Sequence, residues 1–449
     1  MWTLHVEDFG KIESADITVS PLTLFVGDNN SGKSYLLSLI YGLMCVDDAF
    51  ANLCEDSPEY KACAAWIEAA ISHEVAQEPF DDTAYTIFER LLNRILQDNQ
   101  EAILQFIFHE NVSAGKISVT FQREKNQVIE LAHESEKDLY LFEFPFKWYG
   151  VVIVNSNESD ITHVIRYILD CMILGRFTDS RVSFLPTART GFLLTYPALA
   201  QDAFSRAYSQ RSTNRHAQRQ TANLSLTRPC TDFLSSLAAV NGKKISVIAD
   251  KYQSVIRFIE SNLISGKILV SNETPLPEFA YRADNMEASL PMFLTSDVVK
   301  EIAPLILTLQ YLDTDVLFIE EPEMSLHPKL QQAMARTLIK IANVGTPVLA
   351  ATHSDTILQH VNNMIKLNNL PQARRVKFMT RYGFDADDPI SAENVAMYQF
   401  DVQDNGRTTV TRLSCGEYGF EVPTFYDPLK KLLEQTRETE PYDPDDDEE

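Results

Sequence analysis

The chain has 449 residues, of which 45% are hydrophobic and 23% charged, and its formal net charge is −24 at pH 7. This length allows two or three domain-sized units, or one domain with large insertions, and the hydrophobic content is enough for a sizeable core. The charge argues against a protein that coats nucleic acid over its whole surface, although it leaves room for a local basic patch.

The sequence lacks the marks of a secreted or membrane protein. Its six cysteines are scattered, none of them forms a Cys-x-x-Cys pair, and no histidine lies beside them at the spacing of a zinc site. The N-terminus has early acidic residues and no apolar signal core, and no apolar run approaches the roughly 20 residues that span a bilayer. We therefore expect a cytoplasmic protein with reduced thiols and no membrane contact.

Residues 2–26 are predicted to form three short strands, and the third leads into a phosphate-binding loop. Gly27–Ser34 has the sequence GDNNSGKS, which fits the phosphate-loop pattern, and an apolar helical pattern follows it. Gly27 and Gly32 let the backbone turn with its amides pointing inward around phosphate oxygens, at the N-terminus of that helix. Lys33 would supply a positive charge to the outer phosphates, and Ser34 a hydroxyl to Mg²⁺. The predicted nucleotide-binding residues are Gly27, Asn29, Asn30, Ser31, Gly32, Lys33, Ser34 and Tyr35.

The middle of the chain is predicted to hold large insertions in a nucleotide-binding head. Apolar residues recur at helical spacing between about 56 and 110, strand-like runs return at 117–121, 151–154 and 182–186, and 195–263 is again mostly helical. The predicted division is 1–47, head with phosphate loop; 48–112, helical insertion; 113–191, head; 192–264, helical arm; 265–385, head; 386–437, C-terminal β/α extension; and 438–449, tail.

A basic stretch interrupts this acidic chain. Between Asp202 and Asp232 there is no acidic residue, but the stretch contains Arg206, Arg211, Arg215, His216, Arg219 and Arg228. The spacing of 211, 215 and 219 places these arginines along one face of a helix. This local positive charge indicates a patch that contacts DNA or RNA phosphates, or a docking surface for an acidic partner or for the chain's own tail. An ordinary solvated helix face is the third alternative.

A second group of polar residues follows two apolar runs. The run 316–319 ends in Glu320 and Glu321, as expected of a buried parallel strand that delivers carboxylates to a nucleotide. Hydrolysis needs one carboxylate on the magnesium ion and another that orients the attacking water, and we assign these roles to Glu320 and Glu321 respectively. Adjacent strand residues point to opposite faces, so both contribute only where the chain turns, and Pro322 fits such a turn. The next strand, 348–351, leads to His353, which can donate a hydrogen bond to a γ-phosphate.

Two further predictions concern the C-terminal part. Strand-like runs at 395–400 and 408–413, with Asn405-Gly406 between them, predict a hairpin. Residues 438–449 hold eight acidic residues and no basic one, so we expect a solvated, disordered tail.

The order of these motifs resembles that of the ABC-type ATPases of the RecF/SMC/OLD branch. The likeness rests on the phosphate loop, on LFIEEPE at 317–323, on SLHP at 325–328 and on ATHSD at 351–355, and it covers roughly 1–45 and 265–370. It implies an α/β P-loop NTPase fold, namely an ABC ATPase head with a mixed, largely parallel sheet and large helical insertions. It also implies ATP and Mg²⁺ as ligands, Glu321 as the catalytic base, a D-loop that contains Ser325 and His327, and His353 as the switch histidine.

In this family a signature loop of one subunit completes the partner's site in an ATP-sandwiched dimer. Here that loop would lie at 294–300, with Ser296 and Lys300 facing the partner's nucleotide. Asp297 and Val298 follow Ser296 where the family has glycine, which lets the backbone approach the γ-phosphate closely. Either the loop acts through Ser296 alone, or the contact between subunits is weakened. No Q-loop glutamine is identified, so we expect slow hydrolysis.

The resemblance extends to one further element and to a biological role. LPTARTG at 185–191 is similar to an element of the bacterial members, in which Arg189 would touch nucleotide or partner, or form a structural salt bridge. The layout resembles ATPase subunits of anti-phage systems such as PARIS and Septu. We therefore expect a switch ATPase, a homodimer or higher homo-oligomer that controls a separate effector such as a Toprim nuclease. No Glu and Asp-x-Asp pair on successive strands follows His353, so a cleavage centre is not expected in this chain.

Two alternatives to the switch ATPase remain. A RecF/SMC-like DNA-repair ATPase that binds DNA directly is favoured by the basic stretch and opposed by the net charge. A transporter's nucleotide-binding subunit is opposed by the long segment between Ser34 and the signature loop.

Overall fold

The computed structural model describes residues 2–45, 54–72, 77–123, 128–134, 139–143, 152–154, 158–174, 182–210, 226–242, 249–312, 314–416, 419–422, 431–432, 434–436 and 439. The basic residues at 211, 215 and 219 and the tail residues 440–449 lie outside this part. None of the described helices is long and apolar enough to cross a membrane.

A nine-stranded sheet forms the centre of the molecule, in the order β5-β1-β2-β16-β15-β3-β14-β13-β9. Its strands are β1 (Trp2–Phe9), β2 (Ile12–Thr18), β3 (Leu22–Gly27), β5 (Lys116–Phe121), β9 (Val182–Leu185), β13 (Val316–Glu320), β14 (Val348–Ala351), β15 (Val395–Val402) and β16 (Thr408–Arg412). The run β15-β3-β14-β13-β9 is parallel, whereas β1 pairs antiparallel with β2 and β5, and β15 with β16. The predicted α/β P-loop NTPase fold with a mixed, mostly parallel sheet is therefore confirmed, as is the C-terminal hairpin.

The central strands are buried on both faces. Every residue of β3, β13 and β14 is buried, as expected of apolar runs inside a parallel sheet. Successive side chains face two hydrophobic cores, with Phe25 and Phe318 in one, and Leu24 and Leu317 in the other. All carboxyl ends of the parallel strands lie at one edge, where ligands of such sheets bind.

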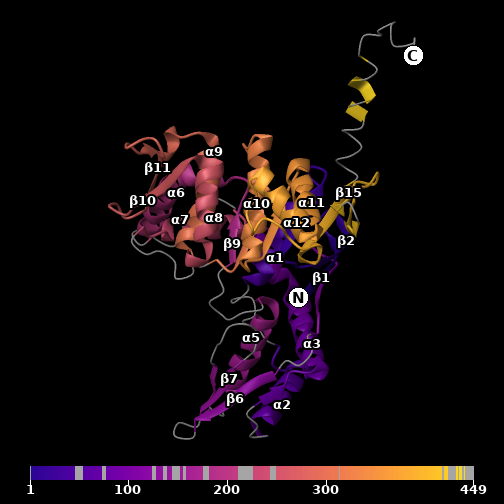
Figure 1. Ribbon diagram of the computed structural model, residues 1–449. Helices are drawn as coiled ribbons and strands as arrows, with labels where there is room; N and C mark the ends of the chain where they lie inside the picture. Colours follow the sequence, from indigo (N-terminus) through magenta and orange to yellow (C-terminus); the bar gives the residue numbers. More distant parts are fainter. Residues whose placement is uncertain are drawn as a thin grey trace, which may run out of the picture.

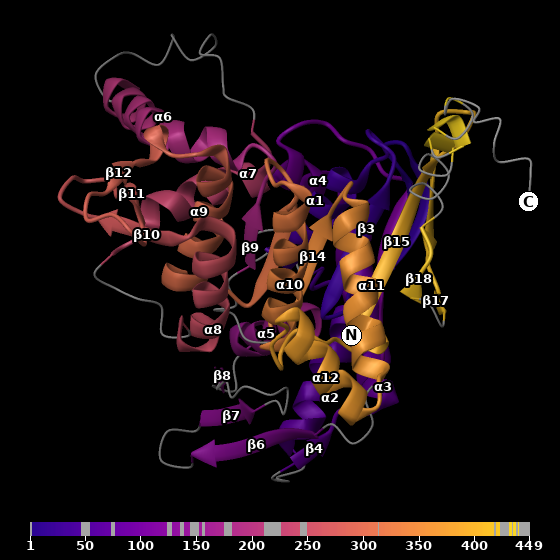
Figure 2. The ribbon, with the colours of Figure 1, turned by 45° about the horizontal axis from the view of Figure 1, so that its top comes forward.

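Helices cover both faces of the sheet. Residues of α1–α5 line the first core and residues of α6–α11 the second. Figure 2 shows α10 and α11 lying along the strands β14, β3 and β15. The helices are α1 (Lys33–Met44), α2 (Pro58–Ser72), α3 (Asp82–Asp98), α4 (Gln100–Phe108), α5 (Glu158–Leu174), α6 (Arg189–Gln210), α7 (Arg228–Ala239), α8 (Ala249–Ile259), α9 (Asp297–Tyr311), α10 (Pro328–Asn343), α11 (Asp355–Asn369) and α12 (Gln372–Tyr382).

The predicted helical insertion over 48–112 differs from the structure in two ways. It contains β4 (Gln77–Pro79), which pairs with β6 (Val128–Glu134) in a second sheet completed by β7 (Leu139–Glu143) and β8 (Val152–Val154). Figure 1 shows this sheet with α2, α3 and α5 on one side of the main sheet. In addition, α3 packs on β5 and α4 packs on α1, so the segment shares the first core with the head. An amphipathic stripe predicts a helix, but it does not say which surface covers that stripe.

The segment 386–437 is not an extension of the head, because β15 and β16 lie in the middle of the main sheet. The predicted arm over 192–264 also contributes to the head, since α6, α7 and α8 line the second core. The small strands β10 (Gly266–Ser271), β11 (Glu278–Ala283) and β12 (Leu290–Pro291) form a separate sheet, and β17 (Cys415–Gly416) pairs with β18 (Gly419–Phe420).

Candidate functional site

The phosphate loop connects β3 to α1, as predicted. Gly27 has φ +127°, and a Cβ there would lie 2.2 Å from the backbone oxygen of Phe400 on β15. Only glycine fits, because the neighbouring strand passes directly behind this residue. Gly32 (φ +96°) and Asn30 (φ +57°) also have left-handed backbones, which turn the loop before α1 begins at Lys33.

Lys33 lies inside the loop and is only 5% exposed. Its Nζ donates hydrogen bonds to the carbonyl oxygens of Gly27 (3.0 Å) and Asp28 (2.5 Å) and to Ser31 Oγ (3.1 Å). Burial lowers the pKa of Lys33 to about 8, although Asp28, Glu321 and Glu323 oppose the shift. The ammonium is therefore held where phosphate oxygens would relieve its desolvation.

The remaining loop residues differ in exposure. Asn29, Asn30 and Ser34 are exposed, so their polar atoms are accessible from solvent. The ring of Tyr35 instead packs against Phe9 (centroids 4.8 Å apart) and Phe108 (4.5 Å). Its side chain thus belongs to the packing between α1, α4 and the β1–β2 turn, and its contribution to ligand binding would come from the backbone amide.

The carboxylates predicted at the end of β13 lie where the chain turns. Glu321 has φ +41°, and its N–H donates to the carbonyl of Ala351 at the end of β14 (2.8 Å). This left-handed residue is the turn that the sequence analysis requires for Glu320 and Glu321 to reach one site. Glu320 Oε2 accepts hydrogen bonds from the N–H (2.9 Å) and the hydroxyl (3.1 Å) of Thr187. Thr187 was not predicted as a site residue, because nothing in its local sequence points to a carboxylate on another strand.

The electrostatics join this carboxylate group to the phosphate loop. Burial raises the pKa of Glu321, and the charges of Glu323 and Glu320 raise it further, while Arg189 and Lys33 oppose the shift. Because β13 pairs with β14 and β14 pairs with β3, the ends of the two blocks lie at the same edge of the sheet.

His353 follows β14, which pairs with β3. Burial and the charge of Lys33 lower its pKa, whereas a hydrogen bond to the Gly27 backbone raises it. The imidazole is therefore neutral at pH 7 and lies beside the phosphate loop, which places Lys33, Glu321 and His353 around the same space.

Glu323 is the main site residue that the sequence analysis did not assign. Its Oε1 accepts a hydrogen bond from the N–H of His353 (2.5 Å), and its Oε2 accepts one from Thr352 Oγ1 (2.8 Å). It thus ties the turn after β13 to the turn after β14. The available signal was a third acid directly after Pro322 in the EEPE run.

Arg189 is a buried structural cation, 1% exposed. Its Nε lies 2.8 Å from Glu301 Oε2, and its two terminal nitrogens donate to the carbonyls of Glu320 (2.7 Å) and Glu321 (3.0 Å). Of the alternatives predicted for Arg189, the structure therefore contains the salt bridge, and the guanidinium supports the carboxylate turn from behind.

The predicted signature and D-loop residues do not join the phosphate loop of their own chain. Ser296 caps α9 by accepting from the N–H of Val299 (3.4 Å), and Lys300 pairs with Asp297 (3.1 Å). His327 caps α10, and Ser325 has φ +58°. In the described part of the chain, no hydrogen bond or ion pair links these residues to Gly27–Ser34. Arg206 lies on α6, but its side chain is not described, so the basic patch stays a prediction.

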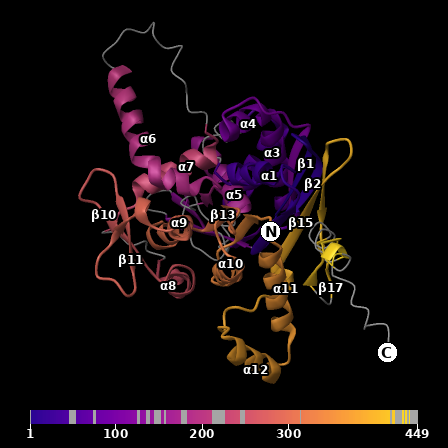
Figure 3. The same ribbon diagram turned by 90° about the horizontal axis from the view of Figure 1, so that it is seen from above.

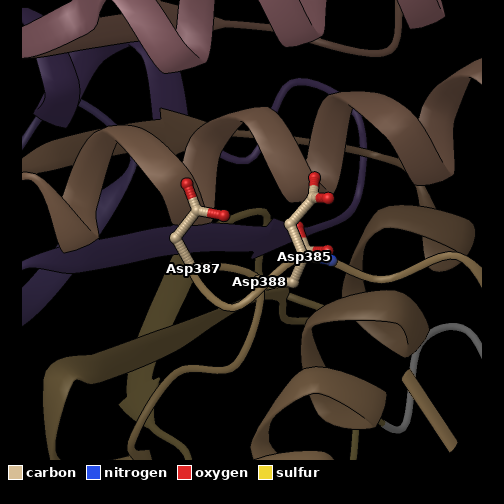
Figure 4. A group of neighbouring side chains, drawn as sticks. All are labelled: Asp385, Asp387 and Asp388. Carbon is tan, nitrogen blue, oxygen red and sulfur yellow. Dashed lines mark hydrogen bonds between the residues drawn. The ribbon is translucent and has the colours of Figure 1, made fainter. Parts of the chain in front are cut away.

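A separate acidic cluster is formed by Asp385, Asp387 and Asp388, whose carboxylates lie within 4.8 Å of one another (Figure 4). Lys340, 2% exposed in its side chain, pairs with all three, and Arg336 pairs with Asp385 (3.3 Å) and Asp388 (2.7 Å). The two cations offset two of the three negative charges, and the cluster is a salt-bridge network between α10 and the segment after α12.

Comparison with known proteins agrees with this architecture. A family profile described as AAA ATPase domain matches residues 1–165 and 207–358. No curated protein matches the chain.

Three solved structures match the chain at low sequence identity. The SMC head bound to the C-terminal winged-helix domain of ScpA is 11% identical, with a TM-score of 0.37, and covers 92% of this chain and 97% of its own. The SMC head domain from Thermotoga maritima is 11% identical, with a TM-score of 0.34 and coverage of 92% and 98%. A Pyrococcus furiosus SMC head with an extended coiled coil, bound to the C-terminal domain of ScpA, is 10% identical, with a TM-score of 0.36 and coverage of 97% and 100%.

Proposed function

Because the chain belongs to the AAA ATPase domain family, we propose that it binds ATP with Mg²⁺, hydrolyses it, and uses the bound state to clamp two heads together. The observation that carries this proposal is the meeting of Lys33, Glu321 and His353 at the carboxyl edge of one parallel sheet.

The residues fit a nucleoside triphosphate. The left-handed glycines Gly27 and Gly32 shape a loop of amides at the start of α1, and Lys33 lies inside it. The exposed hydroxyl of Ser34 and the carboxylate of Glu320 are the proposed ligands of Mg²⁺ or its water shell. The bound ion would neutralise phosphate charge and help to hold the phosphates in line with the attacking water.

Glu321 is the proposed general base. Its raised pKa makes it a better proton acceptor than an exposed glutamate, which suits the removal of a proton from water. The pKa of His353 is lowered, which favours the neutral imidazole in the free protein, and His353 would act as a hydrogen-bond donor to phosphate. Glu323 holds the backbone of His353 in place.

The clamp is supported by two exposed apolar side chains beside the proposed signature loop. Phe293 and Leu294 are 66% and 62% exposed, three and two residues before the cap residue Ser296 of α9. Apolar side chains of this size on a surface are typical of an interface. Ser296 and Lys300 would then reach the nucleotide of the second copy, and Ser325 and His327 would line the same junction.

We further propose that the clamped state controls a separate effector, a Toprim nuclease or a protein of similar role, in anti-phage defence. The support is the sequence resemblance to defence ATPase subunits. The alternative, a DNA-repair ATPase, rests on the basic stretch at 206–219, most of which lies outside the described residues.

Glu321→Gln tests the ATPase proposal. Gln keeps the shape but cannot accept the proton, so kcat should fall by about 10²- to 10⁴-fold, while a fluorescent ATP analogue binds as before. Light scattering should show a dimer that persists with ATP. Lys33→Ala is the matched control, because it should abolish nucleotide binding and the dimer together. Unchanged turnover in Glu321→Gln would overturn the base assignment.

A further inference from the structure

Helix α12 is an exposed element that the ATPase site does not use. None of its residues is buried, and Figure 3 shows it standing apart from the helices that cover the sheet. It is attached through its inner side, where Arg375 donates to the carbonyl of Asn368 (3.3 Å) and Met379 packs on the second core. The opposite side of the helix therefore faces solvent.

This helix is basic in an acidic chain. Its sequence, QARRVKFMTRY, has four cations and no acid, although the whole chain has 63 acidic and 39 basic residues. Arg374, Lys377 and Arg381 recur at spacings of three and four, which aligns them on one face over a length of roughly 10 Å. Among the described residues, none of these three cations forms an ion pair, so no described carboxylate offsets their charge by direct contact.

The acids nearest in sequence do not cancel this charge. Asp385, Asp387 and Asp388 are already paired with Lys340 and Arg336, as described above (Figure 4). Exposed charges farther away than about 8 Å are largely screened at physiological salt, so the charges close to α12 weigh most in binding. The exposed face of α12 is therefore a local concentration of positive charge in a chain with a net charge of −24.

Aromatic side chains lie beside the cations. Tyr382 is 54% exposed and Phe378 39%, their rings are 4.5 Å apart, and the guanidinium of Arg381 lies 5.4 Å from the Tyr382 ring. Phe378 is also stacked on Phe384, which holds the aromatic pair in place. Cations in a row with adjacent aromatic faces are the combination that binds unpaired nucleotides, through phosphate contacts and base stacking.

We propose that α12 binds single-stranded nucleic acid, with phosphates on Arg374, Lys377 and Arg381 and a base stacked on Tyr382. A duplex would use the cations alone, because its bases are already stacked inside the helix. An acidic protein surface would likewise leave the aromatic rings without a stacking partner. This site is separate from the nucleotide site and does not depend on ATP hydrolysis.

The test is fluorescence anisotropy of the full chain with 5′-labelled oligo(dT)20 and oligo(rU)20, and with a blunt duplex of equal length. We expect both single strands to bind more tightly than the duplex, and the preference between them shows whether DNA or RNA is the source. Arg374→Ala/Lys377→Ala/Arg381→Ala should weaken binding roughly tenfold or more at low salt, and should reduce the slope of log K against log salt by about 2. Tyr382→Ala should weaken binding roughly fivefold or more without changing that slope.

The control variant removes three cations elsewhere, Lys61→Ala/Arg282→Ala/Lys431→Ala, all exposed in the described part. It should bind like the unmodified chain. Thermal melting should be unchanged for the α12 variants, because the altered side chains are not buried. Four results would each overturn the proposal: no binding of either strand, preference for the duplex, an α12 variant that behaves like the control, or binding lost only on replacing the arginines at 206–219. A change in oligomeric state without oligonucleotide binding would assign α12 to protein contact instead.

Discussion

Arg189→Met removes the one buried cation that holds the carboxylate turn, and its consequences can be worked out from the contacts. Methionine fills a similar volume but leaves the carboxylate of Glu301, which is 5% exposed, without its counter-charge. Breaking a buried ion pair in this way costs about 3–5 kcal/mol. The carbonyls of Glu320 and Glu321 also lose their donors, at about 1–3 kcal/mol for each buried acceptor.

The measurement is the melting temperature by intrinsic fluorescence. For 449 residues, 1 kcal/mol corresponds to about 1 °C, so the broken pair alone should lower the melting temperature by roughly 3–5 °C. The matched variant is Arg189→Met/Glu301→Gln, in which the glutamine removes the charge but still accepts from the hydroxyl of Thr190 (2.6 Å). It should recover most of the lost stability.

Measuring ATP hydrolysis distinguishes the effect of Arg189 on stability from its effect on the geometry of Glu320 and Glu321. The double variant still lacks the donors to Glu320 and Glu321, so kcat should remain at least about tenfold below normal while ATP affinity changes little. If the single variant melts like the unmodified chain, or if the double variant is no more stable than the single one, the guanidinium is not the support that its contacts indicate.

The other predictions concern the loop and its neighbours. Gly27→Ala should abolish ATP binding and lower the melting temperature much more than the control Gly345→Ala does. A Cβ at Gly27 lies 2.2 Å from the backbone oxygen of Phe400, whereas one at Gly345 (φ +86°) has no atom within 4 Å. Equal shifts in melting temperature for the two variants would contradict the clash. The pKa of Lys33, about 8, lies below its ordinary value, so the free protein loses this charge as pH rises through 8, whereas bound phosphates favour the ammonium. ATP affinity should thus be level below pH 8 and fall by up to about tenfold per pH unit above it, and a level profile up to pH 9.5 would refute the role of the charge. Glu323→Gln removes a negative charge that raises the pKa of Glu321, so the acid limb of the kcat profile should move to lower pH, and an unmoved limb would show that the two carboxylates do not interact.

The sequence indicates those parts of the site that are formed by motifs of neighbouring residues. The phosphate loop combines glycines at fixed spacing with a strand and a helix, and an apolar strand that ends in Glu320 and Glu321 has equally local marks. Thr187, Glu323 and Arg189 act through contacts between strands that lie far apart in the sequence, and one sequence does not show such contacts. The same reason explains why the place of 386–437 in the main sheet was not predicted, because the pairing of β15 with β3 joins residues 373 positions apart.

These non-local contacts form a continuous series along the carboxyl edge of the sheet. Thr187 and Arg189, after β9, hold Glu320 and the carbonyls of the next turn. Glu323 joins that turn to His353 after β14, and His353 reaches Gly27 at the end of β3. Four parallel strands are thus linked at one edge, and each link depends on a buried or half-buried polar group that has a high cost if left unpaired. The geometry of Glu321 is therefore fixed from both sides, which is the pre-organisation that a general base requires. If the proposed function holds, Arg189, which follows a strand three positions from β3 in the sheet, would affect hydrolysis without touching the nucleotide, and the Arg189→Met variant tests this.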